Sequence, residues 1–381
     1  MTLKQFLDNK PLFYEKIDYE RMPRVYNKIK AQLPVSKIIH IVGTNGKGTT
    51  GRFLATALYH KGFNVGHYTS PHILKFNERI WKNRADVSDK ELDFAHQKLY
   101  RLLDREDSAA LSYFEYTTLL AMMVFSDCDY IVLEAGLGGE YDATAVFDKE
   151  LTLFTPIDYD HQAFLGDTIQ SIATTKLNAM QKKAIVGFQK HEEVYRVAEE
   201  IARKKGTELT FIKDLSHEHF EEIDFIADSL NLVEYLKDNL TLAVAALLSL
   251  GFDYNVGDFR DATLFGRLTN IASNIYLDVG HNALAASAIA KSLHGKKFKL
   301  IYNTYKDKDF KTILSILKPI IDSVEILAVN EERIVKKEIL EATLKELSIP
   351  YKDYESIDKE SSYLVFGSFS VAETFLKSYI G

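Results

Sequence analysis

The segment HIVGTNGKGTTGRF, residues 40–53, combines glycines, a lysine and hydroxyl side chains at a spacing that could bind phosphate. A glycine-rich turn at the start of a helix directs backbone N–H groups toward an anion, and the helix dipole adds to the attraction. Lys47 could reach terminal phosphates, and the Thr49 hydroxyl could bind Mg²⁺. The common phosphate loop is G-x-x-x-x-G-K followed directly by Ser or Thr, but here Gly48 follows the lysine. The segment is therefore either a plain tight turn or a specialised nucleotide loop.

Acidic side chains and a histidine follow two further apolar runs. Glu134 follows the run YIVL, at the point where a Mg²⁺–nucleotide site needs a carboxylate, although such an acid can also cap a turn. Asp158, Asp160 and His161 follow the run LTLFTPI. His161 is a candidate metal ligand, with a structural histidine as the alternative.

The run YTSPHILKFNERI brings polar side chains after the strand that follows the phosphate loop. Pro71 prevents a helix from continuing there, so we expect a loop on the ligand-binding edge of the sheet. Its side chains Ser70, His72, Glu78 and Arg79 could bind a polar substrate. The alternative is a solvated loop.

Alternating strand and helix patterns position these groups. SKIIHIVG predicts a buried strand that ends in glycine, KGTTGRFLATALYHKG a helix, and FNVGHYTS a second strand. This βαβ unit places the glycine-rich loop at a strand-to-helix turn, and ligands of parallel α/β sheets bind at such turns. The runs before Glu134 and Asp158 predict further buried strands, and SYFEYTTLLAMMVF predicts a largely buried helix.

From about residue 266 the alternation of strands and helices starts again. We therefore expect an α/β protein with a P-loop-containing, doubly wound N-terminal domain, residues 1–265, and a smaller Rossmann-like C-terminal domain, residues 266–381. In the second domain, LDVGHNAL places Asp278, His281 and Asn282 at a strand-to-helix turn. Asp278 and Asn282 could equally be capping groups.

The composition is that of an ordinary folded protein, with 46% hydrophobic and 27% charged residues among 381. A net charge of −7 gives no global field that would attract nucleic acid. The single cysteine excludes a disulfide framework and favours a reducing compartment. MTLKQFLDNKPLFYEK lacks the apolar core of a signal peptide, and no apolar run approaches the ~18 residues of a membrane span. We expect a cytoplasmic protein without nucleic-acid or membrane partners.

Taken in order, these motifs make the sequence similar to the folylpolyglutamate synthase/dihydrofolate synthase family, relatives of the Mur amino-acid ligases. The resemblance runs from about residue 17 to the C-terminus. GTNGKGT resembles the family's own phosphate loop, which has the additional glycine after the lysine. TSPHILKFNERI resembles its folate loop, LEAGLGGEYDATAV its glycine-rich acidic motif, and DYDHQAFLGDTIQSIATTK its aspartate–histidine motif with a lysine downstream. FGRL, LDVGHNALAA, DKDF and VFGSF resemble its interdomain and C-terminal motifs.

The resemblance implies a role for each matching residue. The ATP-binding residues would be Thr44, Asn45, Gly46, Lys47, Gly48, Thr49, Asn239, Arg267 and Asp278. Thr49 and Glu134 would bind a first Mg²⁺, and Glu134 with His161 a second. The catalytic residues would be Lys47, Lys176, His281 and Arg267, with Lys176 at the position of the family's carbamylated lysine. The substrate-binding residues would be Ser70, Pro71, His72 and Arg79. The resemblance also implies a monovalent cation and a monomer.

The sequence departs from the family pattern at several positions. Glu140 stands where the family usually has arginine, and Ala145 where it usually has asparagine. Lys176 lies in TTKLNAM rather than in the usual EKAG, and Phe265 replaces a proline before Gly-Arg.

The activity that the resemblance implies is ATP-dependent formation of an amide between L-glutamate and dihydropteroate, a folate or both, through an acyl phosphate. One alternative is a Mur-type ligase that acts on another carboxylate, such as a cell-wall nucleotide precursor. That enzyme would need an N-terminal uridine-nucleotide domain, and only about 36 residues precede the phosphate-loop strand. Another alternative is a non-catalytic, ATP-dependent switch, against which the paired Glu134 and His161 argue.

Overall fold

The computed structural model describes residues 2–10 and 18–380, so residues 1 and 11–16 of the N-terminal stretch considered above lie outside the described residues. The chain divides into two compact units, Met1–Thr263 and Leu264–Gly381. The predicted boundary, after residue 265, falls two residues beyond the end of the first unit. Among the described residues, no helix is both long enough and apolar enough to span a membrane.

The first unit is built on an eight-stranded sheet in the order β4-β3-β2-β5-β1-β6-β7-β8. The six strands from β2 to β8 in this order pair in parallel, whereas β3 and β4 form an antiparallel edge. The strands are β1 Lys37–Val42, β2 Val65–Tyr68, β3 Ile80–Lys82, β4 Ala85–Asp86, β5 Tyr130–Glu134, β6 Leu151–Phe154, β7 Lys183–Val186 and β8 Glu208–Phe211.

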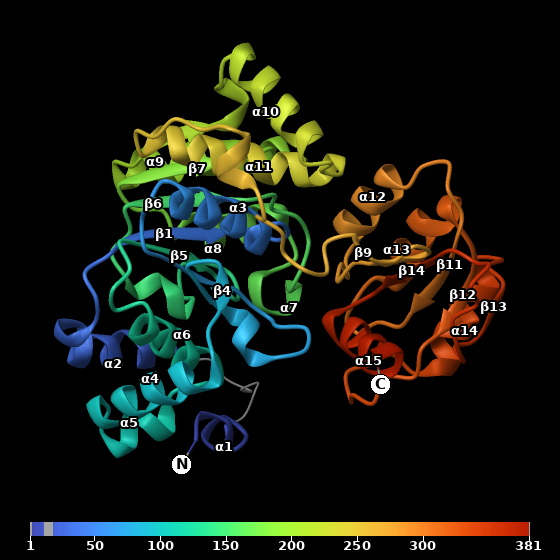
Figure 1. The fold of residues 1–381 in the computed structure, drawn as a ribbon, viewed down its shortest axis with the longest axis horizontal. Helices are drawn as coiled ribbons and strands as arrows, with labels where there is room; N and C mark the ends of the chain where they lie inside the picture. The colour runs from blue at the N-terminus through green and yellow to red at the C-terminus, as the bar shows by residue number, and fades with distance from the viewer. Residues whose placement is uncertain (1, 11–17, 381) are drawn as a thin grey trace. The chain divides into compact units, whose positions relative to one another are not determined.

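Alternating side chains of β1 explain why helices cover both faces of this sheet. Ile39 and Ile41 pack with α3, α10 and α11, whereas Ile38 packs with α4 and α6, and Val42 with α8 and α9. Figure 1 shows α3 and α11 on one side of β1, and α4 and α6 on the other. The helices are α1 Leu3–Leu7, α2 Arg21–Ile29, α3 Lys47–His60, α4 Asp89–Leu102, α5 Arg105–Ala110, α6 Tyr113–Val124, α7 Gln162–Leu165, α8 Ile169–Leu177, α9 Glu192–Lys205, α10 His217–Ser229 and α11 Glu234–Ser249.

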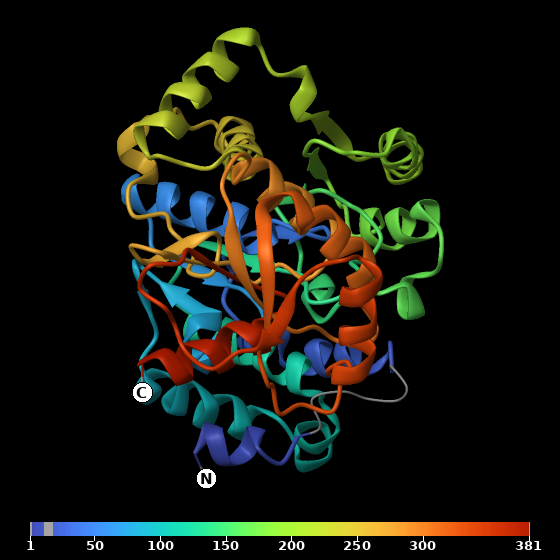
Figure 2. The same cartoon turned by 90° about the vertical axis from the view of Figure 1, so that its right-hand side faces the viewer.

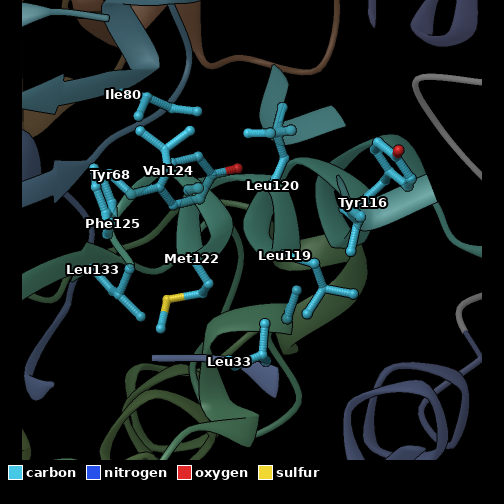
Figure 3. Close-up of a cluster of buried hydrophobic side chains, with 14 of the residues drawn as sticks. Leu33, Tyr68, Ile80, Tyr116, Leu119, Leu120, Met122, Val124, Phe125 and Leu133 are labelled. Carbon is cyan, nitrogen blue, oxygen red and sulfur yellow. The ribbon is translucent and has the colours of Figure 1, made fainter. Parts of the chain in front are cut away.

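Helix α6 is buried, as its apolar sequence predicts. Ser112 caps its first turn by accepting a hydrogen bond from the Glu115 N–H, and the Glu115 side chain accepts one from the Ser112 N–H. Leu119 and Met122 are fully buried. Figure 3 shows them among side chains of β2 and β5. The helix therefore holds the strands that end in the folate-loop motif and in Glu134.

The second unit is a six-stranded sheet in the order β13-β12-β11-β14-β10-β9, parallel except for β9. Helices α12 and α13 pack against each other, and α15 packs on β14. The elements are β9 Thr269–Ala272, β10 Ile275–Leu277, β11 Phe298–Tyr302, β12 Ile321–Ile326, β13 Tyr351–Asp353, β14 Tyr363–Phe366, α12 Ala283–Ser292, α13 Phe310–Leu317, α14 Lys337–Glu346 and α15 Phe369–Ile380. Two α/β sheets of this kind confirm the predicted fold class.

The sequence pattern predicted no helix or strand in residues 182–232, and three of the elements found there are β7, β8 and α10. Strands β7 and β8 extend the parallel sheet beyond β6. Helix α10 adds apolar side chains to the cluster around α3 and α11. Both views place α10 at the end of this unit opposite to α1 (Figure 2).

Candidate active site

The phosphate loop lies between β1 and α3. Gly46 is the N-cap of α3 and has a left-handed backbone with φ of 84°. A Cβ at Gly46 would lie 2.1 Å from Asn239 Oδ1, and one at Gly43 would lie 1.9 Å from Thr155 Oγ1. Both positions therefore require glycine, because the loop passes against neighbouring side chains at van der Waals distance. The glycine-rich segment of residues 43–48 is therefore a conformationally constrained turn at the N-terminus of α3.

Lys47, the first residue of α3, folds back over this loop. Its ammonium lies 3.3 Å from Gly43 O and 3.2 Å from Thr44 O, and donates hydrogen bonds to both. It also lies 3.8 Å from Glu134 Oε1. Because Lys47 is also the first residue of α3, its ammonium is held beside a helix N-terminus, where phosphate oxygens bind readily. Thr44, Asn45, Gly46 and Gly48 form the rest of the loop as the sequence places them.

Thr49 and Glu134 offer oxygen donors of the kind that a hard metal such as Mg²⁺ binds. Thr49 is 3% exposed, and its hydroxyl has no hydrogen-bond partner among the described residues. A buried hydroxyl without a partner is uncommon in folded proteins, so this one is free to bind a ligand. Glu134 ends β5 beside Ile41 of β1, and its Oε2 accepts hydrogen bonds from the Thr69 hydroxyl and, at 3.3 Å, from Ser70 N.

These donors fit a Mg²⁺ ion that is also bound by phosphate and water, rather than a metal that is bound by protein side chains alone. No group of three or more His, Cys, Asp or Glu that could hold a metal occurs in the part of the chain that the structure describes. Mg²⁺ is usually bound through one or two protein oxygens, with phosphates and water completing the octahedron. The Thr49 hydroxyl and the Glu134 carboxylate match that arrangement.

His161 lies on the loop after β6, seven residues beyond the strand end. It has a left-handed backbone with φ of 53° and is the N-cap of α7. Its Nε2 lies 3.9 Å from Asp160 Oδ2, and its side chain is 41% exposed. The loop is attached to the phosphate loop because Thr44 N donates to Pro156 O at 2.8 Å. The second metal site, from Glu134 and His161, remains a prediction.

Lys176, on α8, is brought to the phosphate loop from a distant part of the sequence. Its ammonium donates a 2.9 Å hydrogen bond to Gly43 O, and the residue is 4% exposed. Burial, and next the nearby charge of Lys47, lower the pKa of Lys176 to about 7, while Asp160 and Asp142 act in the opposite direction. A substantial fraction of this amine is therefore neutral and nucleophilic near pH 7.

The substrate-loop candidates divide into two groups. Arg79 Nε donates to His72 Nδ1 at 2.7 Å, and the Arg79 guanidinium lies over the Tyr113 ring. Ser70 N points at Glu134, and the Ser70–Pro71 peptide bond is cis.

Glu78 shapes the loop instead of facing outward. Its carboxylate accepts hydrogen bonds from three successive backbone N–H groups at 2.7–2.9 Å, those of Ile73, Leu74 and Lys75. Of the four side chains in this loop that could bind a polar substrate, Glu78 therefore has a structural role.

Asn239, on α11, supports the phosphate loop. Its Oδ1 accepts a 3.1 Å hydrogen bond from the Thr50 hydroxyl, and its Nδ2 donates to Tyr235 O at 2.9 Å. These bonds fix the amide against Gly46, where a side chain on the glycine would collide with it. Contact of Asn239 with ATP remains a prediction.

The candidates of the second unit cluster at the carboxyl end of β10. Asp278 accepts hydrogen bonds from Leu268 N at 2.8 Å and Gly280 N at 2.7 Å. Asn282 caps α12 through Ala285 N at 2.9 Å, so the capping alternative holds for this residue. Whether Asp278 contacts ATP remains a prediction.

His281 and Arg267 flank this turn. His281 Nδ1 lies 3.2 Å from Val279 O, and Arg267 Nη1 donates to Gly266 O at 3.1 Å. The Arg267 guanidinium also lies 5.7 Å from the centre of the Phe369 ring. Their proposed roles toward ATP are likewise not tested by these contacts.

The departures from the family pattern acquire local partners. Glu140 Oε2 accepts a 2.9 Å hydrogen bond from Asn178 Nδ2, just after α8. Ala145 O accepts one at 2.8 Å from the buried Lys149 ammonium. Both contacts tie the glycine-rich run after Glu134 to neighbouring segments.

Sequence reasoning missed the residues that hold the site loops from behind. Asp142 accepts hydrogen bonds from Gly136 N and Leu137 N, both at 2.9 Å, and so shapes the turn after Glu134. Burial raises the pKa of the Asp142 carboxyl. His191 lies in residues 182–232, for which the sequence pattern predicted no helix or strand, and it contacts Asp158. Asp142 lies within the motif LEAGLGGEYDATAV, but the motif does not show that its carboxylate binds the backbone of the same turn. No local motif marks His191, because its partner Asp158 is distant in sequence.

No family model matches the chain, but known proteins and solved structures are similar to it. A dihydrofolate synthase/folylpolyglutamate synthase of Haemophilus influenzae is 30% identical over 341 residues, which cover 80% of this chain and 77% of that protein. The crystal structure of Helicobacter pylori folylpolyglutamate synthetase is 40% identical with a TM-score of 0.82, covering 98% and 97% of the two chains. Escherichia coli FolC, solved in complex with DHPP and ADP, is 25% identical with a TM-score of 0.80, covering 98% and 96%. The chain therefore belongs to the dihydrofolate synthase/folylpolyglutamate synthase family of ATP-dependent ligases.

Proposed function

We propose that the protein is a bifunctional ligase that adds L-glutamate to dihydropteroate and adds further glutamates to reduced folate. The observation that carries the proposal is the buried, unpartnered Thr49 hydroxyl beside a phosphate loop whose lysine lies 3.8 Å from Glu134. The names of its relatives, and the complex of the E. coli relative with DHPP and ADP, support the choice of substrates.

In the proposed reaction, the acceptor carboxylate attacks the γ-phosphorus of ATP, and the bond to the β-phosphate oxygen breaks to release ADP. The amine of glutamate then attacks the carbonyl carbon of the acyl phosphate, loses a proton and expels phosphate. Two anions must approach each other in the first step, so positive charge near the γ-phosphate lowers the barrier. Lys47 supplies that charge, and the loop N–H groups orient the phosphates.

The metal supplies further charge neutralisation when it is bound by Thr49 and Glu134. Glu134 also accepts hydrogen bonds from Thr69 and Ser70, so its position is fixed before any ligand arrives. The same bonds couple the metal-binding carboxylate to the loop proposed to hold the pterin-bearing substrate through Ser70, Pro71, His72 and Arg79. Acceptor and γ-phosphate would thus be aligned by one short network.

Lys176 is proposed to carry a carbamate. Carbamylation requires an unprotonated amine to attack CO₂, and a pKa of about 7 provides one at neutral pH. The new carboxylate would become a ligand for a second metal together with Glu134 and His161. A monovalent cation and a monomeric state are part of the same proposal, as are ATP contacts by Asn239, Arg267, Asp278 and His281.

A pair of assays tests the function. Purified protein receives ATP, Mg²⁺ and L-glutamate with dihydropteroate in one reaction and tetrahydrofolate in the other, and glutamate-dependent phosphate release is measured. We expect release in both, with products one or more glutamates heavier by mass spectrometry. Release with one acceptor alone reduces the proposal to a single activity, and release with neither overturns it.

A further inference from the structure

The connection between β7 and α9 reaches across to the loop that follows β6. Gln189 Oε1 accepts a 2.8 Å hydrogen bond from Ile157 N. The Gln189 side-chain amide also donates to Thr155 O at 3.2 Å and to Gly187 O at 3.1 Å. Just beyond the ends of β6 and β7, the Gln189 side chain thus makes hydrogen bonds to backbone groups of both segments.

The next two side chains of the connection both meet Asp158. His191 Nε2 lies 2.9 Å from Asp158 Oδ1, and Lys190 Nζ lies 3.4 Å from Asp158 Oδ2. The Asp158 side chain is 9% exposed, and that of His191 is 25% exposed. Tyr159 N also donates to Oδ1 at 2.9 Å. This buried carboxylate therefore has three donors, two of them from the connection.

The backbone of Asp158 is attached to the phosphate loop. The Thr44 hydroxyl donates to Asp158 O and accepts from Asp158 N, each at 3.1 Å. Asp158 therefore joins three segments: the phosphate loop, the loop that continues to His161, and the β7–α9 connection. Loss of the His191 donor would take one of two partners from Asp158 Oδ1, and an incompletely paired buried carboxylate is costly, so the loop should shift.

The turn toward His161 repeats the same arrangement two residues later. His161 N donates to Asp160 Oδ1 at 2.9 Å, as Tyr159 N does to Asp158. Two consecutive bends of this kind determine where the His161 imidazole emerges. The second bend follows directly from the first, so its position depends on how firmly Asp158 is held.

We infer that His191, acting through Asp158, is a positioning residue that holds the His161 loop against the phosphate loop. His191 touches neither nucleotide nor acceptor in this role. It fixes the distance between the Thr44 side of the phosphate loop and the imidazole proposed to bind the second metal. The inference rests on the proposed function, because it assumes that His161 is a metal ligand.

The test compares two substitutions at one position. His191→Phe keeps a ring but removes the donor, whereas His191→Gln keeps an N–H donor of similar reach. Mn²⁺ binding is measured by electron paramagnetic resonance in the presence of a non-hydrolysable ATP analogue. The matched control is His217→Phe, because His217 lies 3.3 Å from Glu221 in a comparable pair whose histidine side chain is 89% exposed.

We expect wild-type protein to bind two Mn²⁺ ions. Removing a group hydrogen-bonded to a metal ligand typically weakens metal binding about 10- to 100-fold, and His191 acts one contact further away, so the lower end of that range applies. His191→Phe should therefore weaken the weaker site about 10-fold, His191→Gln should restore most of that loss, and His217→Phe should match wild type. The melting temperature of all three variants should stay within a few degrees of wild type.

Three outcomes overturn the inference. Two ions bound with wild-type affinity in His191→Phe would show that the loop needs no such support. Equal losses in His191→Phe and His191→Gln, accompanied by a large fall in melting temperature, would reduce His191 to a general packing residue. A single ion in wild-type protein would remove the second metal itself, so that the failure would lie in the proposed function.

Discussion

At the ends of β1 and β5, Lys47, Thr49 and Glu134 come from two neighbouring strands and one helix turn. A second region, made of the loop after β6 and the buried Lys176 of α8, is by contrast assembled from separate parts of the chain. Lys176 reaches Gly43 from α8 across 133 positions of sequence, and His191 reaches Asp158 from 33 positions away. The first region depends on local backbone geometry, and the second depends on side-chain contacts between segments.

The comparison separates reactive groups that the backbone of one loop positions from reactive groups that contacts with distant segments must position. The phosphate loop owes its shape to two crowded glycines and a helix N-terminus. The second region is held by side-chain contacts: Gln189 and His191 hold the loop after β6, and the Lys176 ammonium bonds Gly43 O. Substitutions in the first region should therefore abolish turnover with little change in stability, whereas those in the second should couple activity to pH, metal and packing.

Lys47→Ala is the largest expected loss. Removing one electrostatic contact to the developing charge typically lowers kcat about 10²- to 10³-fold. Stability should change little, because among the described residues the Lys47 ammonium bonds two carbonyls of its own loop and lies 3.8 Å from Glu134. Steady-state kinetics and thermal unfolding measure the two effects. The exposed Lys204 on α9 gives the control, Lys204→Ala, and near-normal turnover of Lys47→Ala would disprove the nucleotide assignment.

Lys176→Ala tests the second region. If the lysine carries a carbamate, the variant loses a metal-binding carboxylate, and we expect kcat to fall on the order of 100-fold. Acetate or propionate should partly restore turnover by occupying the vacated space. Full activity without any added acid would show that this protein works without the modification.

The same two regions differ in how well the sequence predicts them. GTNGKGT, the strand before it and the carboxylate of Glu134 are local signals, and the fold class follows from strand and helix periodicity. The roles of Glu78 and Asp142 could not be read, because each binds backbone N–H groups whose direction depends on the final turn. The contact of His191 with Asp158 depends on β7 pairing with β6, which lies in a stretch without a clear pattern.

The buried amine of Lys176 also predicts how stability depends on pH. Its pKa in the folded protein is about 7, against 10.5 for the ordinary side chain. Between these values the unfolded chain binds more protons, so the free energy of unfolding rises with pH by about 1.4 kcal/mol per unit from this group. Below the folded pKa both states are protonated and the dependence ends.

Lys176→Met removes that dependence. Relative to wild type, the variant should therefore gain stability as the pH falls from 10 toward 7, and the difference should level off below about pH 7. Denaturant unfolding at each pH measures it. A wild-type protein that is fully carbamylated has no ammonium to titrate, so a flat difference would favour the carbamate over the free amine.

The smallest effect is expected at Glu140, where the sequence departs from the family pattern. Its side chain accepts the hydrogen bond from Asn178, and its backbone N–H donates to Thr175 O at 3.0 Å. Glu140→Ala removes only the side-chain bond, which is worth about 1 kcal/mol in a typical protein. Glu140→Gln keeps an acceptor for Asn178 and should lose less. Denaturant unfolding compares the two, and kcat should change no more than about threefold, because the backbone bond still holds the glycine-rich run to α8. A fall in kcat of much more than threefold, with a stability loss of only about 1 kcal/mol, would mean that Glu140 acts on the reaction itself. It would then belong with Lys176 among the groups that must be held in place around the second metal.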